Sequence, residues 1–243
     1  MKQQPTAIIT EILKARLVPF QEYIFGFADL RGLLVKKFEG YKYGLSIGKR
    51  LDDEIINNLD CGPTIEYYDH YNQLNDELTT VSRRIETDLK SKGIVSLAII
   101  PTISTGTQGY EDYMETLSYD ISHKMVATRA GLGWIGKSDL FISEEFGPRL
   151  RLVSILLKED PGNLTEPVLK SKCGKCNICV IRCPAKAANG KLWDIYTNRD
   201  EFFNAFSCRE KCAELARQKL NVSERICGLC ISVCPWGQKN KPN

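Results

Sequence analysis

The sequence predicts a chain of two parts, in which a mixed α/β or α+β domain is followed by a small cysteine-rich module. Three observations predict this organisation. Helical and strand-like hydrophobic patterns alternate irregularly through the first 165 residues. Nine of the ten cysteines lie after residue 172. Between the two regions, the stretch KEDPGNLTEPVLKSK has two prolines, a glycine and few apolar residues, which is typical of a linker or docking loop. We therefore expect domains at residues 1–165 and 166–243.

Three segments of the first domain have helical spacing of their apolar residues. The first spans residues 6–17. The second runs from Asp69 to Lys92 and ends at Gly93, which suits a left-handed C-cap. The third spans residues 123–130 and ends at Gly131. In the second segment the apolar residues recur every three or four positions, at Leu74, Leu78, Val81, Ile85 and Leu89.

Strands are predicted where apolar runs are short and bounded by turn residues. Tyr43–Ile47 has the composition of a short strand, with a turn expected at the following Gly-Lys-Arg. Residues 94–100 are almost wholly apolar and are stopped by Pro101, as in a buried strand. Residues 150–157 form the third such run.

The composition indicates a soluble globular protein, with 43% hydrophobic and 26% charged residues. A net charge of +3 is weak evidence for a nucleic-acid partner, so any basic patch would have to be local. No apolar run is long enough for a membrane span, and the first twenty residues lack the apolar core of an export signal. We expect a cytoplasmic protein without a membrane partner. Because the cytosol keeps thiols reduced, ten cysteines then indicate metal rather than disulfides.

The cysteines form two runs of characteristic spacing. The first run is C-x2-C-x2-C-x3-C-P, ending at Cys183 and Pro184. The second is C-x2-C-x3-C-P, ending at Cys234 and Pro235. In two-cluster ferredoxins, the cysteine before proline ligates the cluster of the other run. Zinc sites or disulfides would not explain the third cysteine at this spacing or the Cys-Pro pairs. The sequence therefore predicts two [4Fe–4S] clusters, with the first held by Cys173, Cys176, Cys179 and Cys234.

The second cluster would take Cys183, Cys227, Cys230 and one further thiolate. That ligand is either Cys208 or Cys212. We favour Cys208, because we expect it to precede a helix over residues 209–220, whose N-terminus would stabilise a thiolate.

The segment GLGWIGK matches the pattern G-x-G-x-x-G through Gly131, Gly133 and Gly136. A dinucleotide-binding site requires a strand before this pattern and a helix after it. Here a helical segment precedes it, so a nicotinamide site is not favoured. The pattern instead suggests a helix C-cap followed by a tight loop that closely approaches another group.

These motifs together resemble the epoxyqueuosine reductase family, which is related to reductive dehalogenases. The resemblance rests on ATRAGLGWIGKSDLFISEEFGPRLRL, on the helical segment that begins YYDHYNQLNDEL, and on CGLCISVCPWG near the end. It implies a cobalamin-binding reductase domain followed by a ferredoxin-like domain with two clusters. Electrons would pass from the clusters to a base-off corrinoid and then to a substrate. The chain resembles a short member without the helical-repeat extension.

The resemblance also suggests site residues. The glycine loop would contribute to the cofactor site through Gly131, Gly133, Trp134, Gly136 and Lys137. Leu117 falls where the family has a proton-donating aspartate, so His123 and nearby Asp120 are the candidate catalytic residues. A histidine is suited to donate a proton near pH 7. Trp236 is expected to pack over a cluster.

The predicted function is an epoxyqueuosine reductase-like iron–sulfur oxidoreductase. Two alternatives remain open: an electron-transfer protein without its own substrate, and a tRNA epoxyqueuosine reductase proper. Expected partners are a low-potential electron donor of the ferredoxin or flavodoxin type and a small-molecule or nucleoside substrate. Leu117 and the absent extension make tRNA the less favoured substrate.

Overall fold

The structure is a computed structural model that describes residues 5–103 and 105–238. The chain forms two compact units, each built from separate stretches of the sequence. Unit 1 consists of Met1–Lys49, Leu74–Leu132 and Arg151–Val168. Unit 2 consists of Arg50–Gln73, Gly133–Leu150 and Leu169–Asn243. All ten cysteines therefore belong to unit 2.

The centre of unit 1 is a four-stranded sheet in the order β1-β2-β6-β3. Its neighbouring strands run antiparallel in the pairs β1–β2 and β3–β6. Between β2 and β6, the N–H of Lys42 donates to Leu157 O and that of Leu51 donates to Arg149 O, so this pair is antiparallel as well. The strands are β1 Tyr23–Asp29, β2 Tyr43–Arg50, β3 Ser96–Ile99 and β6 Leu150–Leu157.

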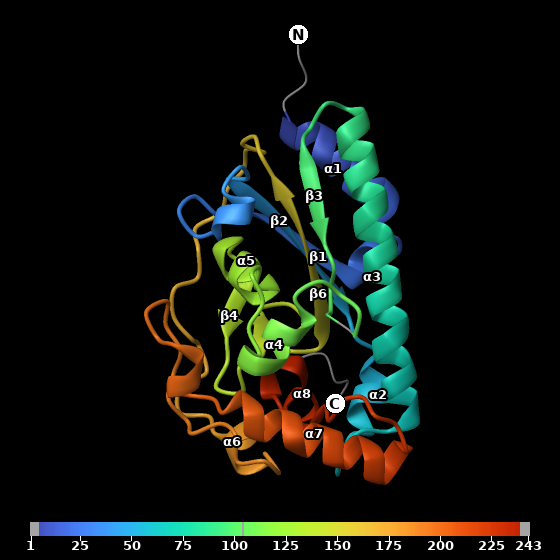
Figure 1. The fold of residues 1–243 in the computed structure, drawn as a ribbon, viewed down its shortest axis with the longest axis vertical. Helices are drawn as coiled ribbons and strands as arrows, with labels where there is room; N and C mark the ends of the chain where they lie inside the picture. The colour runs from blue at the N-terminus through green and yellow to red at the C-terminus, as the bar shows by residue number, and fades with distance from the viewer. Residues whose placement is uncertain (1–4, 104, 239–243) are drawn as a thin grey trace. The chain divides into compact units, whose positions relative to one another are not determined.

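Each face of this sheet buries a separate set of apolar side chains. Along β6, Val153, Ile155 and Leu157 belong to one cluster and Leu156 to the other, as the two-residue period of a strand requires. The first cluster also contains residues of α1 Pro5–Arg16 and α3 Ile65–Ser91. The second contains residues of α5 His123–Arg129. The short helix α4 Tyr110–Thr116 precedes α5. Figure 1 shows α3 along one side of the sheet and α5 on the other.

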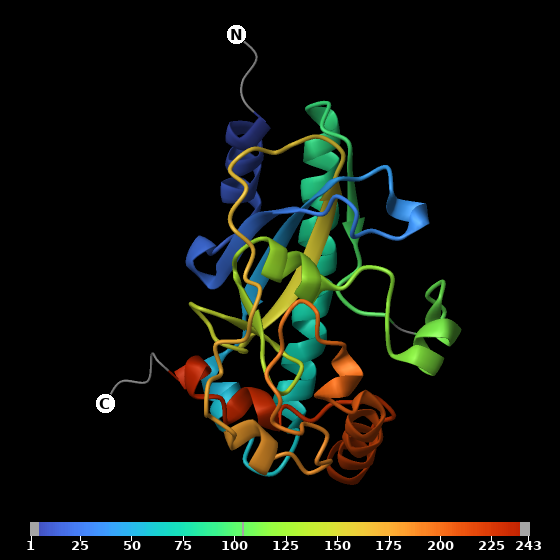
Figure 2. The same cartoon turned by 90° about the vertical axis from the view of Figure 1, so that its left-hand side faces the viewer.

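Unit 2 is built from short elements. A two-stranded sheet pairs β4 Gly133–Ile135 with β5 Phe141–Ser143. The helices are α2 Asp53–Asn57, α6 Ile178–Ile181, α7 Ala205–Leu220 and α8 Leu229–Ser232, together with the first turns of α3. Helices α2 and α8 pack against each other (Figure 2). With so few strands and helices, unit 2 relies on its loops and their side-chain contacts.

The mixed α/β fold is confirmed, and its main sheet is wholly antiparallel. The three predicted helices are present in α1, α3 and α5, and the three predicted strands in β2, β3 and β6. The turn expected at Gly-Lys-Arg after Ile47 is wrong, because Gly48 and Lys49 pair with Ile24 and Tyr23 of β1 and extend β2 to Arg50. Strand β1 was not predicted.

In the described part of the chain, no helix combines the length and the apolar character needed to cross a bilayer.

Candidate metal centre

The first cysteine run forms a loop that a buried lysine fastens. Lys137 is only 4% exposed, and its Nζ donates to the carbonyl oxygens of Gly174 and Cys176, each at 3.0 Å. The third bond goes to Asn177 Oδ1 at 2.8 Å. An ammonium group has three protons, so all of its donors are used. The side chain of Lys137 thus holds the cysteine loop rather than offering its charge to a phosphate or propionate group.

The glycines of GLGWIGK are explained by close packing within the protein. A Cβ at Gly136 would lie 2.5 Å from Ile142 Cδ1 and 3.5 Å from Cys173 Sγ. A Cβ at Gly133 would overlap the carbonyl oxygen of Ile142 in β5. In unit 1, Gly131 follows α5 with a φ of +70°, a conformation that favours glycine. The expected tight loop is therefore present, and the group that Gly136 approaches is the first cysteine run.

Trp134 and Trp236 pack together in unit 2. Their ring centroids lie 4.6 Å apart with the planes at 78°. Trp134 is fully buried, and its Nε1 has no hydrogen-bond partner among the described residues. An unpaired buried N–H costs roughly 1–3 kcal/mol. The Nε1–H of Trp134 could therefore donate a hydrogen bond to a bound group that is not part of the polypeptide.

Cys234 of the second run lies among cysteines of the first. Burial, with smaller contributions from the neighbouring Cys173 and Cys179 thiolates, raises the pKa of Cys234 to about 11. The backbone N–H groups of Trp236 and Gly237 donate to its sulfur and oppose this rise. Two cysteine runs separated by more than forty residues in the sequence thus share one group of sulfurs.

A second group of sulfurs surrounds Cys230. Burial is the main cause that raises the pKa of this thiol well above its usual value, because the charged form would be desolvated. Neighbouring thiolates raise it further, and they come from both runs and from α7: Cys227, Cys208, Cys179 and Cys183.

Cys208 and Cys212 both belong to this second group. Their sulfur atoms lie 3.9 Å apart. The Cys212 thiol also forms a hydrogen bond with Cys227, and this bond lowers the pKa of Cys227 to about 7. Hydrogen bonding with Cys212 likewise lowers the pKa of Cys208, whereas the pKa of Cys212 itself is raised. The sulfur of Cys212 therefore lies close to those of both Cys208 and Cys227, and one thiol proton can be shared within this group.

The expectation that Cys208 precedes its helix is wrong. Helix α7 begins at Ala205, because the side chain of Asn204 accepts the N–H of Ser207 at 3.0 Å and caps the helix four residues before Cys208. Cys208 therefore lies inside the helix, and Cys212 follows it one turn later on the same face.

The donor set fits iron–sulfur clusters. All ten cysteines are free thiols, and nine fall within the cysteine-rich region. Backbone N–H groups point at several sulfurs, as at Cys183, whose Sγ accepts from the Ala187 N–H at 3.4 Å. Buried, mutually repelling thiolates need cations, which bound iron supplies. Within the described residues, no three or more His, Cys, Asp or Glu side chains converge on the position of a single metal ion.

The two candidate catalytic residues lie in unit 1 and are engaged there. His123 Nε2 lies 2.8 Å from Ile100 O, so this nitrogen carries the proton, and Nδ1 accepts from Ser154 Oγ at 2.9 Å. Loss of hydration on burial is the main cause that lowers the pKa of His123 to about 4. The ring is therefore neutral at pH 7. Asp120 forms an ion pair with Lys37.

Two residues that support the cysteine groups were not predicted. The Ser138 hydroxyl hydrogen-bonds the Cys179 sulfur. Arg149 is 1% exposed, and it donates to Asp53 Oδ1 at 2.7 Å and to Asn57 Oδ1 at 2.9 Å. No local pattern marks either residue. The only signal is an arginine at the start of an apolar strand, which requires a buried partner.

Comparison with known proteins agrees with this donor set. Residues 172–237 match the family described as a 4Fe-4S double cluster binding domain. An epoxyqueuosine reductase of Synechococcus sp. (strain CC9605) is 33% identical over 120 residues, which are 49% of this chain and 36% of that protein. The chain thus spans about a third of the length of this relative. The predicted resemblance to the epoxyqueuosine reductase family is confirmed over about half of the chain.

Solved structures share the fold at low sequence identity. An epoxyqueuosine reductase with an epoxyqueuosine-modified tRNA-Tyr stem loop has a TM-score of 0.60 and 17% identity, covering 98% of this chain and 68% of that one. A reductive dehalogenase structure that suggests a mechanism for B12-dependent dehalogenation has a TM-score of 0.62 and 14% identity, covering 89% and 30%. The predicted mixed α/β fold is confirmed, and the match over residues 172–237 supports the predicted cluster-binding region.

We predict that Lys137→Met disrupts the first cysteine loop. The substitution leaves two carbonyl oxygens and one amide oxygen without their donor, at a cost on the order of 2–4 kcal/mol. Iron content after anaerobic reconstitution should fall, and the midpoint of urea unfolding should shift downward. Lys175→Met, an exposed lysine of the same loop, is the matched control and should retain both values. Equal behaviour of the two variants would contradict the role of Lys137.

We predict that His123 stays neutral well below the usual pKa of histidine. The chain has two histidines, so His70→Gln leaves His123 as the only ring signal in an NMR titration. At a pH of about 5.5, where an ordinary histidine is mostly protonated, His123 should remain neutral. Because the folded pKa is lowered, its contribution to stability is complete above about 6.5 and is lost as the pH falls through about 4. A reversible titration with a midpoint near 6.5 would contradict this prediction.

Proposed function

We propose that this chain is an iron–sulfur reductase of the epoxyqueuosine reductase type, which holds two [4Fe–4S] clusters and delivers electrons to a cofactor or substrate. The observation that carries the proposal is the position of Cys234 beside Cys173 and Cys179. A cysteine that precedes proline and reaches the other run is how two-cluster ferredoxins share their ligands. The similarity to epoxyqueuosine reductases and to 4Fe-4S double cluster domains supports the reaction class.

In this proposal each cluster draws ligands from both runs. The first cluster is held by Cys173, Cys176, Cys179 and Cys234. The second cluster is held by Cys183, Cys227, Cys230 and Cys208. We propose Cys208 as the eighth ligand, because it is one of the neighbouring thiols that act on Cys230. The 3.9 Å separation of the Cys208 and Cys212 sulfurs keeps Cys212 within reach as the alternative ligand.

The protein's own contribution is to hold these ligands and control the surroundings. When bound, the clusters supply one-electron transfer and a corrinoid supplies a strongly reducing metal centre. Lys137 fixes the backbone of the first cysteine loop from inside. The packed rings of Trp134 and Trp236 hold the chain that follows Cys234 in place. The Ser138 hydroxyl and the backbone N–H groups stabilise negative charge on sulfur.

We propose base-off cobalamin as the cofactor, because the fold is similar to that of a reductive dehalogenase whose dehalogenation is B12-dependent. The GLGWIGK loop would contribute to its site through Gly131, Gly133, Trp134, Gly136 and Lys137. The three hydrogen bonds of the Lys137 ammonium group occupy its side chain, so Lys137 fits a corrinoid only through its backbone atoms. The Nε1 of Trp134 has no partner among the described residues and can donate to a bound group. We propose a small molecule or nucleoside as substrate, with tRNA less favoured, and a ferredoxin or flavodoxin as electron donor.

A second candidate is an electron-transfer protein without a substrate of its own. It is favoured by the engagement of both candidate catalytic residues, with His123 bonded to Ile100 and Ser154 and Asp120 paired with Lys37. In a reductase, either residue would have to exchange its present contact for a substrate before donating a proton.

We predict that Cys183→Ser removes the second cluster although Cys183 belongs to the first run. Anaerobically reconstituted wild type should contain about eight irons per chain, and this variant about four. Iron analysis and low-temperature EPR of the reduced protein measure the loss. Cys208→Ser should behave like Cys183→Ser, whereas Cys212→Ser should keep both clusters. If Cys212→Ser loses a cluster and Cys208→Ser does not, the eighth ligand is Cys212.

The reductase proposal is tested by corrinoid binding to the reconstituted protein. We expect cobalamin to co-elute with the protein on anaerobic gel filtration and to show a base-off spectrum that changes when the clusters are reduced. An epoxyqueuosine nucleoside or stem loop added next tests turnover directly. Intact clusters that reduce an artificial acceptor, with neither co-elution nor spectral change, would overturn the corrinoid proposal in favour of the electron-transfer protein.

A further inference from the structure

The segment that contains the first cysteine run has an unusual charge. Residues 167–193 include five lysines and one arginine but no aspartate or glutamate. The whole chain carries a net charge of only +3, so this is a local concentration. Lys172 and Lys191 pair with Glu144 and Glu201, whereas Lys175 and Lys186 are exposed and form no ion pair with a described residue. We call the exposed lysines of this segment the basic face: Lys170, Lys172, Lys175, Lys186 and Lys191.

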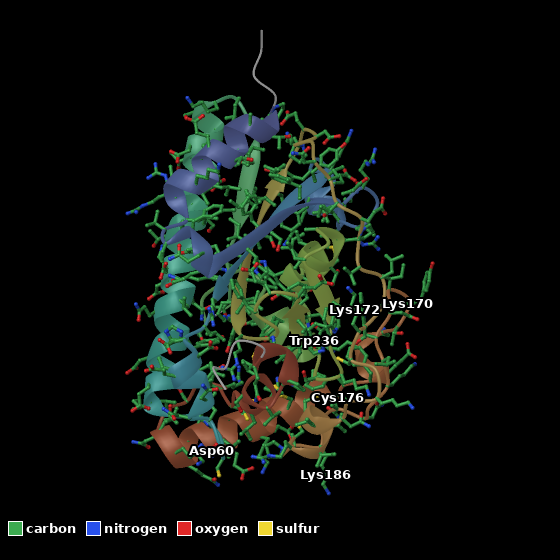
Figure 3. The ribbon with its side chains drawn as sticks, turned by 180° about the vertical axis from the view of Figure 1, so that it is seen from behind. Asp60, Lys170, Lys172, Cys176, Lys186 and Trp236 are labelled. Carbon is green, nitrogen blue, oxygen red and sulfur yellow. The ribbon has the colours of Figure 1, made fainter. Side chains whose placement is uncertain are left out.

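Hydrogen bonds join the parts of the segment into one surface. The N–H of Ser171 donates to Trp193 O at 2.8 Å, and that of Ile195 donates to Leu169 O at 3.0 Å. A Cβ at Gly190 would lie 3.5 Å from Asn177 Oδ1, which brings the loop before Lys191 next to the cysteine loop. Figure 3 shows Lys170, Lys172, Cys176 and Lys186 along the same side of unit 2.

The segment that carries the basic face, together with the residues that follow it, also exposes apolar side chains and a predicted cluster ligand. Ile181 is 78% exposed and Tyr196 is 88% exposed, with Ile178 and Leu192 each more than 40% exposed. Cys176 is exposed as well, whereas Cys234 of the same sulfur group is buried. If the lysines served only to balance the negative charge of a bound cluster, no exposed apolar side chains would be needed beside them. Exposed apolar residues on a segment rich in exposed lysines are typical of a protein-binding surface.

We propose that the basic face is the docking site for an acidic one-electron carrier protein, which passes its electron to the first cluster at Cys176. This inference rests on the proposed function and assigns the surface through which the reductant acts. The lysines attract an acidic carrier over a distance, and Ile178 and Ile181 form its short-range apolar contact. Encounters of this kind bury little area, are weak and depend on charge. The carrier's centre loses one electron and the cluster gains it, without proton transfer or bond formation.

An acidic ferredoxin, reduced beforehand, is the probe for this site. Mixing it with the oxidised holoprotein in a stopped-flow instrument gives the second-order rate of cluster reduction. The rate should fall steeply as the ionic strength rises from about 0.05 to about 0.3 M, because salt screens exposed charges. The double variant Lys175→Glu/Lys186→Glu should lower the rate by about tenfold or more at low salt. Ile181→Ser should lower it with little change in its salt dependence.

The matched control is Lys14→Glu/Lys36→Glu, which makes the same charge change at exposed lysines of unit 1. This control should keep the wild-type rate to within about twofold. An equal loss of rate in both double variants would show a general charge effect and overturn the docking site. So would a rate that does not depend on salt.

A reduced zwitterionic viologen separates failure of the docking site from failure of the proposed function. The reagent carries one sulfonate, which balances the single positive charge of the reduced viologen, so it is neutral and needs no docking surface. It should therefore reduce the clusters equally in every variant. Absence of reducible clusters with this reagent would remove the proposed function itself. Normal viologen reduction with an acidic ferredoxin that is indifferent to the basic face would overturn only the docking site. Loss of stem-loop RNA binding in Lys175→Glu/Lys186→Glu, with an unchanged ferredoxin rate, would assign the face to nucleic acid instead.

Discussion

The gathering of cysteine sulfurs in unit 2 is the constraint on which its other features depend. Thiolates in a small, partly buried volume repel one another and lose hydration, which is why the pKa values of Cys179, Cys230 and Cys234 are raised. Without iron, these thiols favour their protonated form. When iron is bound, the neighbouring thiolates become its ligands, because the positive charge of iron outweighs their mutual repulsion. Folding of unit 2 and assembly of its clusters are therefore coupled.

The residues that position the sulfurs come from three stretches of the chain: the segment between β4 and β5, the residue before β6, and helix α2. Lys137 reaches the first loop from the segment between β4 and β5, and Ser138 next to it contacts Cys179. Arg149 is buried and paired with Asp53, and its side chain lies where a Cβ on Gly237 would stand. Two nitrogens of this buried guanidinium bond Asp53 and Asn57, whereas Nε has no partner among the described residues. The two bonds offset part of the cost of burying the charge, so they also restrict how the stretches can rearrange. The cysteine runs alone would lack this support.

The sequence predicts the elements whose hydrophobic period is long or unbroken. Helix α3 and strand β6 are of this kind. Strand β1 was not predicted because Gly26 interrupts its apolar run. The glycine leaves room for Ala130, which follows α5, and this long-range contact cannot be recognised from the local sequence. The start of α7 was missed because Asn204 caps the helix earlier than its charged run suggests.

Spacing in the sequence can reveal some features of the site and not others. Cysteine spacing reflects the geometry of the ligated group, so it predicts which residues converge. The glycine loop was read as an approach to a cofactor, and its spacing could not reveal that Gly136 approaches Cys173 or that Lys137 binds loop carbonyls. Such contacts join residues almost forty positions apart, and a single sequence does not record them. The exposed apolar side chains around Cys176 likewise become apparent only once burial is known.

The contact between Gly147 and the segment after Cys234 has a consequence for biosynthesis. A Cβ at Gly147 would overlap the backbone of Trp236 and Gly237, so the two backbones lie directly against each other. The β4–β5 region is synthesised about ninety residues earlier than its partner, and contacts of such separation form late in folding. The contact around Gly147 therefore cannot form until Gly237 has been synthesised, and until then the first run lacks its partner cysteine from the second. The order of synthesis thus makes the second cysteine run, rather than the first, the step that permits cluster assembly.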